Sequence, residues 1–270
     1  MCVLKFIFWN IGRKSLILEL KEIIKNKQAD IIALAEFDGK ADDLLSMLSM
    51  ENMNYHLIPQ IGCQRITILS KLMPNHFKHR AETEYYTVKE LFVPGWYKLL
   101  VAFIHFPSKL FTTDDDQMVE SQMFKQEIEM AEKQCKNYNT IIVGDFNMNP
   151  FENGMVGASA IHSIPCSLTA KQIKRVIKGR EYSMFYNPMW NLFGDNDNKP
   201  GTYYYKKSSH LVYFWNMFDQ VIIRPGLIDK FDCNSLEIIS KAGEISLVDD
   251  NHRPCLSDHL PIFFSLKEEV

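Results

Sequence analysis

Two polar side chains follow an apolar run near the middle of the chain. In TIIVGDFN, residues 140–147, Asp145 and Asn147 come directly after Ile-Ile-Val-Gly. Residues i and i+2 of an extended chain point to the same face, so a carboxylate and an amide are presented side by side. Such a pair could hold a ligand. Because Asp-x-Asn is also a common turn pair, these two residues alone do not define a function.

Polar or ionisable residues stand at the ends of other apolar runs as well. They are Asn10, Glu36, His105, Asp219, Asp258 and His259. Each has an ordinary structural explanation by itself, as a turn former, a solvated carboxylate or a hydrogen-bonded imidazole. If the strands deliver them to one rim of a sheet sandwich, they form a set suited to metal chemistry on a phosphate. Mg²⁺ needs only one or two protein carboxylates and leaves positions for phosphate oxygens, and Glu36 suits the principal ligand.

The apolar runs predict buried strands, and helical periodicity appears between them. The runs are short and bounded by turn residues, and they cover residues 3–9, 31–35, 66–69, 99–104, 141–143, 220–223 and 262–266. Apolar stripes predict helices over 16–27, after a candidate cap at Ser15, over 41–50, and after the acidic residues 114–116. Strands and helices do not alternate strictly, which favours mixed sheets covered by helices over a doubly wound parallel sheet.

The chain reads as one domain over residues 1–270. No internal repeat, low-complexity tract or Pro/Gly/Ser linker divides it. Residues 151–215 are rich in aromatic residues, asparagine and glycine, which predicts a long aromatic and basic insertion.

Composition limits the class of protein and its compartment. The net charge of −3 provides no global positive field, so contact with nucleic acid must come from local patches. The six cysteines are scattered singly without zinc spacing, which predicts reduced thiols in a cytoplasmic protein. The N-terminus lacks the pattern of a secretion signal, and no apolar run approaches the ~20 residues that span a bilayer, so we expect no membrane insertion.

Six motifs in order give the chain a family resemblance. They are WNI at 9–11, the strand-end Glu36, the strand-end His105, GDFN at 144–147, FDQV at 218–221 and SDHLP at 257–261. In this order they resemble the endonuclease/exonuclease/phosphatase superfamily of metal-dependent phosphoesterases, whose fold is that of deoxyribonuclease I. The resemblance implies an α+β fold, a four-layer α/β-sandwich with two mixed, mainly antiparallel sheets packed face to face and flanked by helices.

The resemblance also implies a metal site. Glu36 would coordinate Mg²⁺, for which Mn²⁺ could substitute. Asn10 would lie beside it, either as a ligand or as a residue that holds the carboxylate. Asp258 could bind a metal directly.

Catalytic roles follow from the same resemblance. Asp145 would align or deprotonate the attacking water, and Asn147 would hydrogen-bond a phosphate oxygen or orient the nucleophile. His259 would contact the scissile phosphate while Asp219 binds its other ring nitrogen. His105 would stabilise or protonate the leaving oxygen. The sequence leaves open whether Asp145 or His259 takes the proton from water.

The sequence departs from two subfamilies. The metal glutamate lies in LAEFDG, where Ala35 replaces the glutamine of the abasic-site enzymes. In deoxyribonuclease-like members a second glutamate pairs with the histidine at the position of His105, and Glu82, Glu84 and Glu90 all lie in the matching region. No cysteine spacing matches the short disulfide loop of secreted deoxyribonucleases. Both subfamilies are therefore disfavoured.

Three features are candidates for substrate binding. The segment 169–180, TAKQIKRVIKGR, predicts a helix with one basic face. This face could track a phosphate backbone, or it could be an ordinary solvated face of a surface helix. The residues on it are Lys171, Lys174, Arg175 and Lys178. Tyr203 and Tyr205, next to two lysines, suit base stacking or packing within a lid. Arg65 could reach the site from a strand edge.

The leading hypothesis is a Mg²⁺-dependent nuclease or phosphodiesterase that hydrolyses nucleic acid by in-line attack of water. The alternative is a phosphatase or phosphodiesterase of a small or lipid-like phosphoester, which the negative net charge favours. A binding module without catalysis would have lost some of the ligands, and every main position is filled. Endo or exo action, the number of metals and the oligomeric state stay open.

Overall fold

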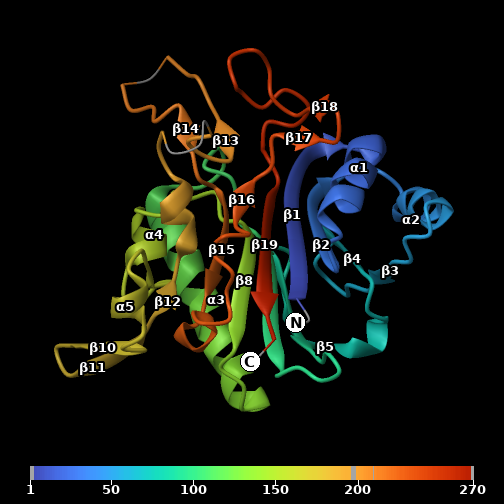
Figure 1. Ribbon diagram of the computed structural model, residues 1–270. Coiled ribbons are helices and arrows are strands. Elements are labelled where there is room, and N and C mark those ends of the chain that lie inside the picture. The colour runs from blue at the N-terminus through green and yellow to red at the C-terminus, as the bar shows by residue number, and fades with distance from the viewer. Residues whose placement is uncertain (1–2, 196–198, 209, 269–270) are drawn as a thin grey trace.

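Two β-sheets packed face to face form the centre of the molecule, and helices cover their outer faces (Figure 1). The computed structural model describes residues 3–195, 199–208 and 210–268. The predicted four-layer α+β sandwich with two mixed, mainly antiparallel sheets is confirmed.

The first sheet contains both ends of the described chain. Within the described residues its order is β16-β19-β1-β2-β4-β3. β1 and β2 run parallel and the other neighbours antiparallel. The strands are β1 (Val3–Lys14), β2 (Ile31–Phe37), β3 (His56–Ile58), β4 (Ile66–Ser70), β16 (Glu237–Ile238) and β19 (Ile262–Lys267).

The second sheet carries most of the predicted catalytic strand ends. Its order is β5-β6-β7-β8-β15-β12-β9, with parallel pairing of β7 with β8 and of β12 with β9. The strands are β5 (Phe77–Glu82), β6 (Tyr86–Leu91), β7 (Leu99–His105), β8 (Thr140–Asp145), β9 (Ser163–Ile164), β12 (Phe185–Tyr186) and β15 (Asp219–Ile223). All seven predicted strands are therefore present in the two sheets.

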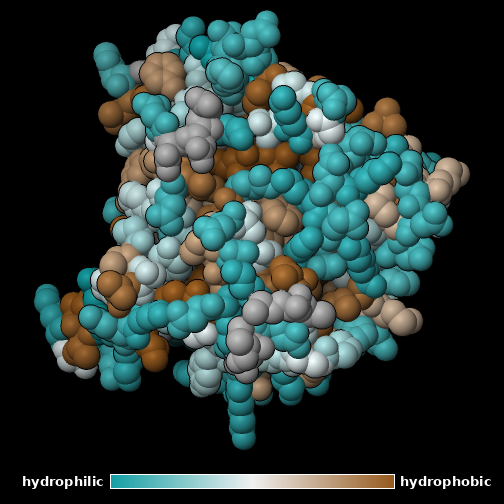
Figure 2. Space-filling model, viewed as in Figure 1, coloured by the Kyte–Doolittle hydropathy of each residue, from teal (hydrophilic) through white to brown (hydrophobic). Residues whose placement is uncertain are grey.

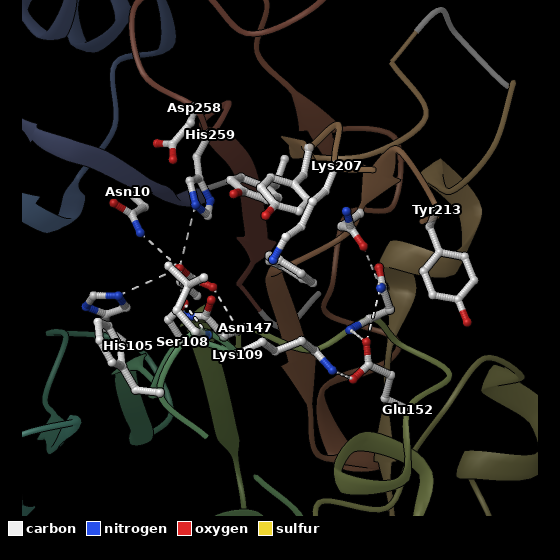
Figure 3. Close-up of a pocket in the computed structure, with 18 of the residues that line it drawn as sticks. Asn10, His105, Ser108, Lys109, Asn147, Glu152, Lys207, Tyr213, Asp258 and His259 are labelled. Atoms are coloured by element: carbon white, nitrogen blue, oxygen red, sulfur yellow. Dashed lines mark hydrogen bonds and ion pairs between the residues drawn. The ribbon is translucent and has the colours of Figure 1, made fainter. Parts of the chain in front are cut away.

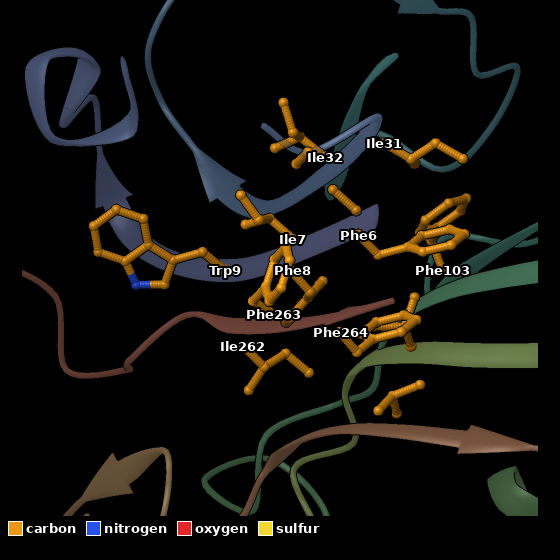
Figure 4. Packing of buried hydrophobic residues seen from close by; sticks show 14 of the residues in the cluster. Phe6, Ile7, Phe8, Trp9, Ile31, Ile32, Phe103, Ile262, Phe263 and Phe264 are labelled. Carbon is orange, nitrogen blue, oxygen red and sulfur yellow. The ribbon is translucent and has the colours of Figure 1, made fainter. Parts of the chain in front are cut away.

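Aromatic and branched side chains fill the space between the sheets. Phe6 of β1 and Phe264 of β19 stack with ring centroids 4.8 Å apart, and Phe103 of the second sheet lies beside them (Figure 4). All three are buried. Strands with both faces covered read as continuous apolar runs, which explains why the sequence signals them clearly.

Two helices lie beside the first sheet and one long helix covers the second (Figure 1). The first two are α1 (Ile17–Lys27) and α2 (Ala41–Met50), and the long one is α3 (Asp114–Cys135). Phe124 and Ile128 of α3 pack in a cluster with residues of β7 and β8. None of the helices in the described ranges combines the length and apolar character that a membrane crossing requires.

The starts of two helices differ from expectation. α1 begins after Leu16, which has φ 39°, and no side chain caps it, so the predicted cap at Ser15 is wrong. Thr113 caps α3 in a capping box with Asp116, which places the acidic residues inside the first turn. Carboxylates are stabilised there by the positive end of the helix dipole.

The described part of the insertion, residues 151–215, contains only short elements, and the predicted helix over 169–180 is wrong. α4 (Asn153–Val156) and α5 (Ser167–Ala170) are single turns, and β10 (Lys174–Ile177) and β11 (Arg180–Ser183) form a hairpin. Lys178 and Gly179 connect these strands with φ 49° and 77°, as in a two-residue type I′ turn. The hairpin projects from the body, and apolar side chains are exposed on it, among them Val176 (Figures 1 and 2).

Two further pairs of short strands and turns of 3-10 helix complete the part of the chain that the structure describes. β13 (Tyr203–Tyr204) pairs with β14 (Trp215–Asn216), and β17 (Lys241–Ala242) pairs with β18 (Ile245–Ser246). Turns of 3-10 helix cover Pro74–His76, Pro188–Leu192 and Pro225–Leu227. β13 and β14 lie at the end of the molecule where the candidate site opens (Figure 1).

A buried polar network fastens the insertion to α3. The Lys125 ammonium donates to the carbonyls of Ala158 and Ser183, at 3.0 and 2.9 Å. His162 Nδ1 lies 3.0 Å from the Ser183 carbonyl, to which it donates. Burial and the nearby positive charge of Lys125 lower the pKa of His162 to about 4.

Acid is therefore expected to loosen this attachment. In the unfolded chain this histidine has an ordinary pKa of about 6.5, so it binds a proton that it does not bind in the folded chain. The free energy of unfolding therefore falls as the pH drops from 6.5 to 4. His162→Asn keeps a donor toward Ser183 and suits φ 58°, but it does not titrate. Between pH 7 and 4.5 the original protein should lose about 2 kcal/mol more unfolding free energy than the variant. Urea titrations at both pH values measure this, and equal losses would contradict it.

Candidate active site

Three predicted catalytic residues lie in one row across the second sheet. His105 ends β7, Asp145 ends β8 and Asp219 begins β15. His105 pairs with Asp145 in the β7–β8 register, and Asp219 pairs with Asp145 in the β8–β15 register. Paired residues of neighbouring strands point to the same face, so the register brings these side chains together. Asn10 joins them from β1 of the first sheet, and His259 joins them from the segment that precedes β19 (Figure 3).

Gly144 permits the close approach of β7 and β8 at this row. A Cβ at this position would stand 2.0 Å from the backbone oxygen of Ile104. The neighbouring strand therefore occupies the space that a side chain at this position would need.

Asp145 is the centre of the site. Its side chain is 1% exposed, and two amides orient it. Asn10 donates to Oδ2 at 2.9 Å, and Asn147 donates its backbone N–H to Oδ1 at 2.8 Å and its amide to Oδ2 at 3.3 Å. The Nε2 atoms of His105 and His259 lie 3.8 and 3.9 Å from Oδ2. The carboxylate is thus held rigidly with two imidazoles beside it.

Asn10 holds this carboxylate with an amide whose orientation is fixed. Its Oδ1 accepts a hydrogen bond from the backbone N–H of Gly12 at 3.1 Å, which leaves Nδ2 to donate to Asp145. Of the two expected roles, this geometry matches the holding of a carboxylate. The carboxylate concerned is Asp145 and not Glu36.

His259 and Asp219 form a buried ion pair. His259 Nδ1 lies 2.7 Å from Asp219 Oδ2, which leaves Nε2 facing the cleft, as expected. Trp9 donates its indole N–H to the His259 carbonyl at 2.9 Å. Burial disfavours the charged imidazole, but the carboxylates of Asp219 and Asp145 outweigh it and raise the pKa of His259 to about 10.

The glutamate expected to pair with His105 is not among the three candidates. Glu82 accepts backbone N–H groups of residues 61 and 62, Glu84 pairs with Arg65 at 3.5 Å, and Glu90 pairs with Arg80. His105 Nε2 instead lies 3.4 Å from Glu36 Oε1. Within the described residues, the buried Nδ1 of His105 has no hydrogen-bond partner.

The carboxylates that face the cleft fit a hard cation. Glu36 and Asp258 both line it, Glu36 partly exposed and Asp258 exposed, so their oxygens are open to water and ligands. Asp145, Asp219 and His259 also bring ligand atoms within 4.8 Å of one another, but His259 and the fully buried Asp219 are already bonded to each other. Oxygen ligands beside an open cleft are what Mg²⁺ and Mn²⁺ prefer.

Glu36 has a strained backbone, with φ 51°. The left-handed region costs a non-glycine residue about 1 kcal/mol, and such strain gathers at functional sites. We therefore expect the free energy of unfolding of Glu36→Gly to equal that of Glu36→Gln or to exceed it by up to about 1 kcal/mol. Both variants should lose Mn²⁺ binding in calorimetry. A glycine variant less stable than the glutamine variant would show that φ 51° carries no strain.

The catalytic cluster lies at one end of a cleft of about 650 Å³. Tyr203 and Tyr205 line it as predicted, with ring centroids 6.1 Å apart, and Tyr203 packs on His259 at 4.6 Å. Tyr204 turns away to pack on Trp215. Burial raises the pKa of Tyr203 to about 12, so its hydroxyl stays protonated.

The other predicted substrate residues do not line this cleft. Lys171 pairs with Asp229, and Lys174 pairs with Glu181 across the hairpin. The basic face disappears because alternate residues of a strand point to opposite faces. Arg65 lies over the ring of Tyr85 and pairs with Glu84. The members outside the cleft lining are Arg65, Lys171, Lys174, Arg175 and Lys178.

The cleft contains residues that sequence reasoning missed. They are Arg13, Lys109, Asn149, Glu152 and Asn216. Lys207, one of the two lysines noted beside Tyr203 and Tyr205, also lines the cleft. Arg13 pairs with Glu36 at 3.4 Å. Proximity in sequence to WNI, His105 and GDFN was the available signal for Arg13, Lys109 and Asn149.

The model of the "Endonuclease/Exonuclease/phosphatase family" matches residues 13–251. The chain belongs to this family. Its members are phosphoesterases, so the protein is a phosphoester hydrolase by descent. Comparison with curated protein sequences finds no match.

Solved structures of the endonuclease/exonuclease/phosphatase fold resemble the chain over almost its full length. TDP2 of D. rerio, complexed with a single-strand DNA product, has a TM-score of 0.59 at 16% identity, covering 99% of this chain and 100% of that chain. ANGEL2, a 2′,3′-cyclic phosphatase, has a TM-score of 0.60 at 13% identity, covering 98% and 95%. The human Nocturnin catalytic domain has a TM-score of 0.56 at 13% identity, covering 99% and 95%. At these identities the likeness establishes the fold.

Proposed function

We propose that the protein hydrolyses phosphodiester bonds of nucleic acid strands with the help of Mg²⁺. The observation that carries this proposal is the aromatic wall that begins at the catalytic cluster, where Tyr203 packs on His259 and Tyr205 packs on Tyr203. A strand whose phosphate lies at His259 has an adjacent base within reach of these rings, and bases of every type stack on aromatic faces. The resemblance of the fold to TDP2, solved with single-strand DNA product, is consistent with this choice.

Each part of the reaction has a residue in place. Asp145, fixed by Asn10 and Asn147, aligns the attacking water and accepts its hydrogen bond. His259 directs Nε2–H to a non-bridging phosphate oxygen because Asp219 occupies Nδ1. His105 lies on the other side of Asp145, where Nε2 can donate to the leaving oxygen.

A divalent cation bound by Glu36 and Asp258 would neutralise charge on the phosphate oxygens. Mg²⁺ is the proposed ion because the available ligands are oxygens and the open cleft leaves room for its waters. Mn²⁺ is expected to substitute, since it accepts the same ligands.

Cleavage assays test the proposed function. Purified protein should cut at least one of single- or double-stranded DNA or RNA with Mg²⁺ or Mn²⁺, and removal of the ion with EDTA should stop the reaction. Restoring Mg²⁺ should recover it. Failure to cut any polymer under these conditions would contradict the proposal.

A second candidate function has its own observation. Several large apolar side chains are exposed at the mouth of the cleft, namely Leu110, Phe111, Leu211 and Tyr213. They favour a small or lipid-like phosphoester with an apolar group. Turnover of such an ester with weak salt dependence would support this alternative, because few phosphates would be neutralised, whereas a steep dependence would favour a nucleic acid.

A further inference from the structure

The cleft has a second polar end, beyond the catalytic cluster. Lys109, Lys207 and Asn216 line it, and none of them belongs to the catalytic row. In Figure 3 the side chain of Lys207 reaches into the space between His259 and the Lys109–Glu152 pair. All three side chains carry N–H donors, which is the chemistry that recognises a phosphate.

The amide of Asn216 has a defined orientation. Asn149 Oδ1 accepts from the backbone N–H of Met217 at 2.9 Å, so the amide nitrogen of Asn149 is the atom that faces Glu152 and Asn216. It donates to Glu152 Oε1 at 3.1 Å and to Asn216 Oδ1 at 2.8 Å. Since Oδ1 of Asn216 is occupied, its NH₂ group is left as the donor toward the cleft.

The two lysines differ in their surroundings. Lys109 forms ion pairs with Asp114 at 2.7 Å and with Glu152. Burial disfavours its charge, but these two carboxylates outweigh the burial and raise the pKa of Lys109, so its ammonium stays charged and fixed. Lys207 lines the cleft and forms no ion pair with any residue that the structure describes.

The wall between the two ends of the cleft is aromatic. Tyr203 packs against Phe218 at 5.1 Å and against Tyr205, and all three rings line the cleft. Stacking on such a wall requires an unpaired base. The volume of about 650 Å³ lies in the range of small-ligand pockets, which suits a strand end better than a duplex.

We propose that Lys207 and Asn216, supported by Lys109, bind the phosphate next to the scissile one in single-stranded nucleic acid. The base between the two phosphates stacks on the wall at Tyr205. This inference rests on the proposed function and adds a substrate class to it: a single strand with at least two consecutive phosphates. Because Asp114 and Glu152 pair with Lys109, the subsite selects by placement of donors more than by general attraction.

Binding of singly neutralised oligonucleotides tests the inference. A fluorescent single-stranded thymidine octamer is prepared with one uncharged methylphosphonate at each linkage in turn, and its affinity is measured by anisotropy in Ca²⁺, with intact strands verified on a gel. Besides the scissile position, one adjacent linkage should show a loss of about tenfold when neutralised. In Lys207→Gln the loss at that linkage should disappear, whereas the exposed neighbour in Lys206→Gln should leave the whole pattern unchanged.

Asn216→Asp provides a change of opposite sign. The aspartate keeps an oxygen to accept from Asn149 but turns a negative oxygen toward the phosphate. The fully charged octamer should bind more weakly, and neutralising the adjacent linkage should now strengthen binding. Melting temperatures close to that of the original protein show that the variants are folded. If Asn216→Asp does not fold, the comparison of Lys207→Gln with Lys206→Gln decides whether the subsite exists.

The outcomes separate this inference from the proposed function. An unchanged pattern in Lys207→Gln, no position-dependent loss, or no binding of the octamer overturns the subsite. If the octamer is cut in Mg²⁺ but Lys207→Gln does not change the loss at the adjacent linkage, the subsite is overturned and the proposed function stands. If Lys207→Gln removes that loss but no polymer is cut, the subsite stands and the proposed function is overturned.

Discussion

Replacing Asp145 with asparagine is expected to lower kcat for phosphodiester hydrolysis by about 10³-fold or more. The variant keeps the size of the side chain, but a neutral amide no longer attracts the hydrogens of the attacking water or the imidazoles at 3.8 and 3.9 Å. It also places an NH₂ group where Asn10 and Asn147 now donate. Single-turnover cleavage with saturating enzyme measures the effect on the chemical step.

The matched control for this prediction is Asp38→Asn. Asp38 is an exposed carboxylate outside the cleft lining, and its variant has the same change of charge. It should retain the original kcat. If Asp145→Asn remained folded and cut within tenfold of the original rate, Asp145 would not be the residue that positions the water.

The second large effect concerns stability. Arg224 and Glu132 form a buried bidentate pair, with Nε–Oε1 and Nη2–Oε2 distances of 2.7 and 2.9 Å. Arg224 also donates to the Met184 carbonyl at 3.1 Å and stacks on Phe185 at 3.8 Å. Arg224→Met should lower the free energy of unfolding by about 3–5 kcal/mol, because Glu132 is left as an unpaired buried charge. Urea unfolding at pH 7 measures this loss.

The double variant Glu132→Leu with Arg224→Met tests the physical reason. Removing both charges removes the unpaired carboxylate, so most of the lost stability should return. If the double variant were as unstable as the single one, the loss would come from packing and not from the stranded charge of Glu132.

Local patterns predicted the strands because both sheets are buried and their strands appear as apolar runs. The family motifs were visible because several of these strands end at polar residues. The contacts that complete the site lie between residues far apart in sequence. Asn10 and Asp145 are bonded across 135 residues, and Asp219 and His259 across 40. No spacing rule reaches this far, and only the family resemblance suggested Asp219 as the partner of His259. The role of Asn10 toward Asp145 required the structure.

The prediction of a basic helix shows how a local pattern misleads. Lys171, Lys174 and Lys178 match helical spacing, but the β-branched Val176 and the Lys178-Gly179 turn favour a hairpin. The turn signal was present in the sequence and was outweighed by the charge pattern. No local signal identified the carboxylate that lies beside His105. The three candidates, Glu82, Glu84 and Glu90, pair with other groups in the structure.

The alignment of His105, Asp145 and Asp219 on paired strands has a consequence for how such a protein can change. Their positions follow from main-chain hydrogen bonds of β7, β8 and β15, whereas Tyr203, Lys207 and the other outer groups of the cleft belong to separate surface segments. Under the proposed function, the reaction chemistry and the choice of substrate therefore belong to different parts of the chain. Grafting a new outer segment onto this scaffold should redirect the enzyme to another phosphoester while leaving its chemical machinery intact.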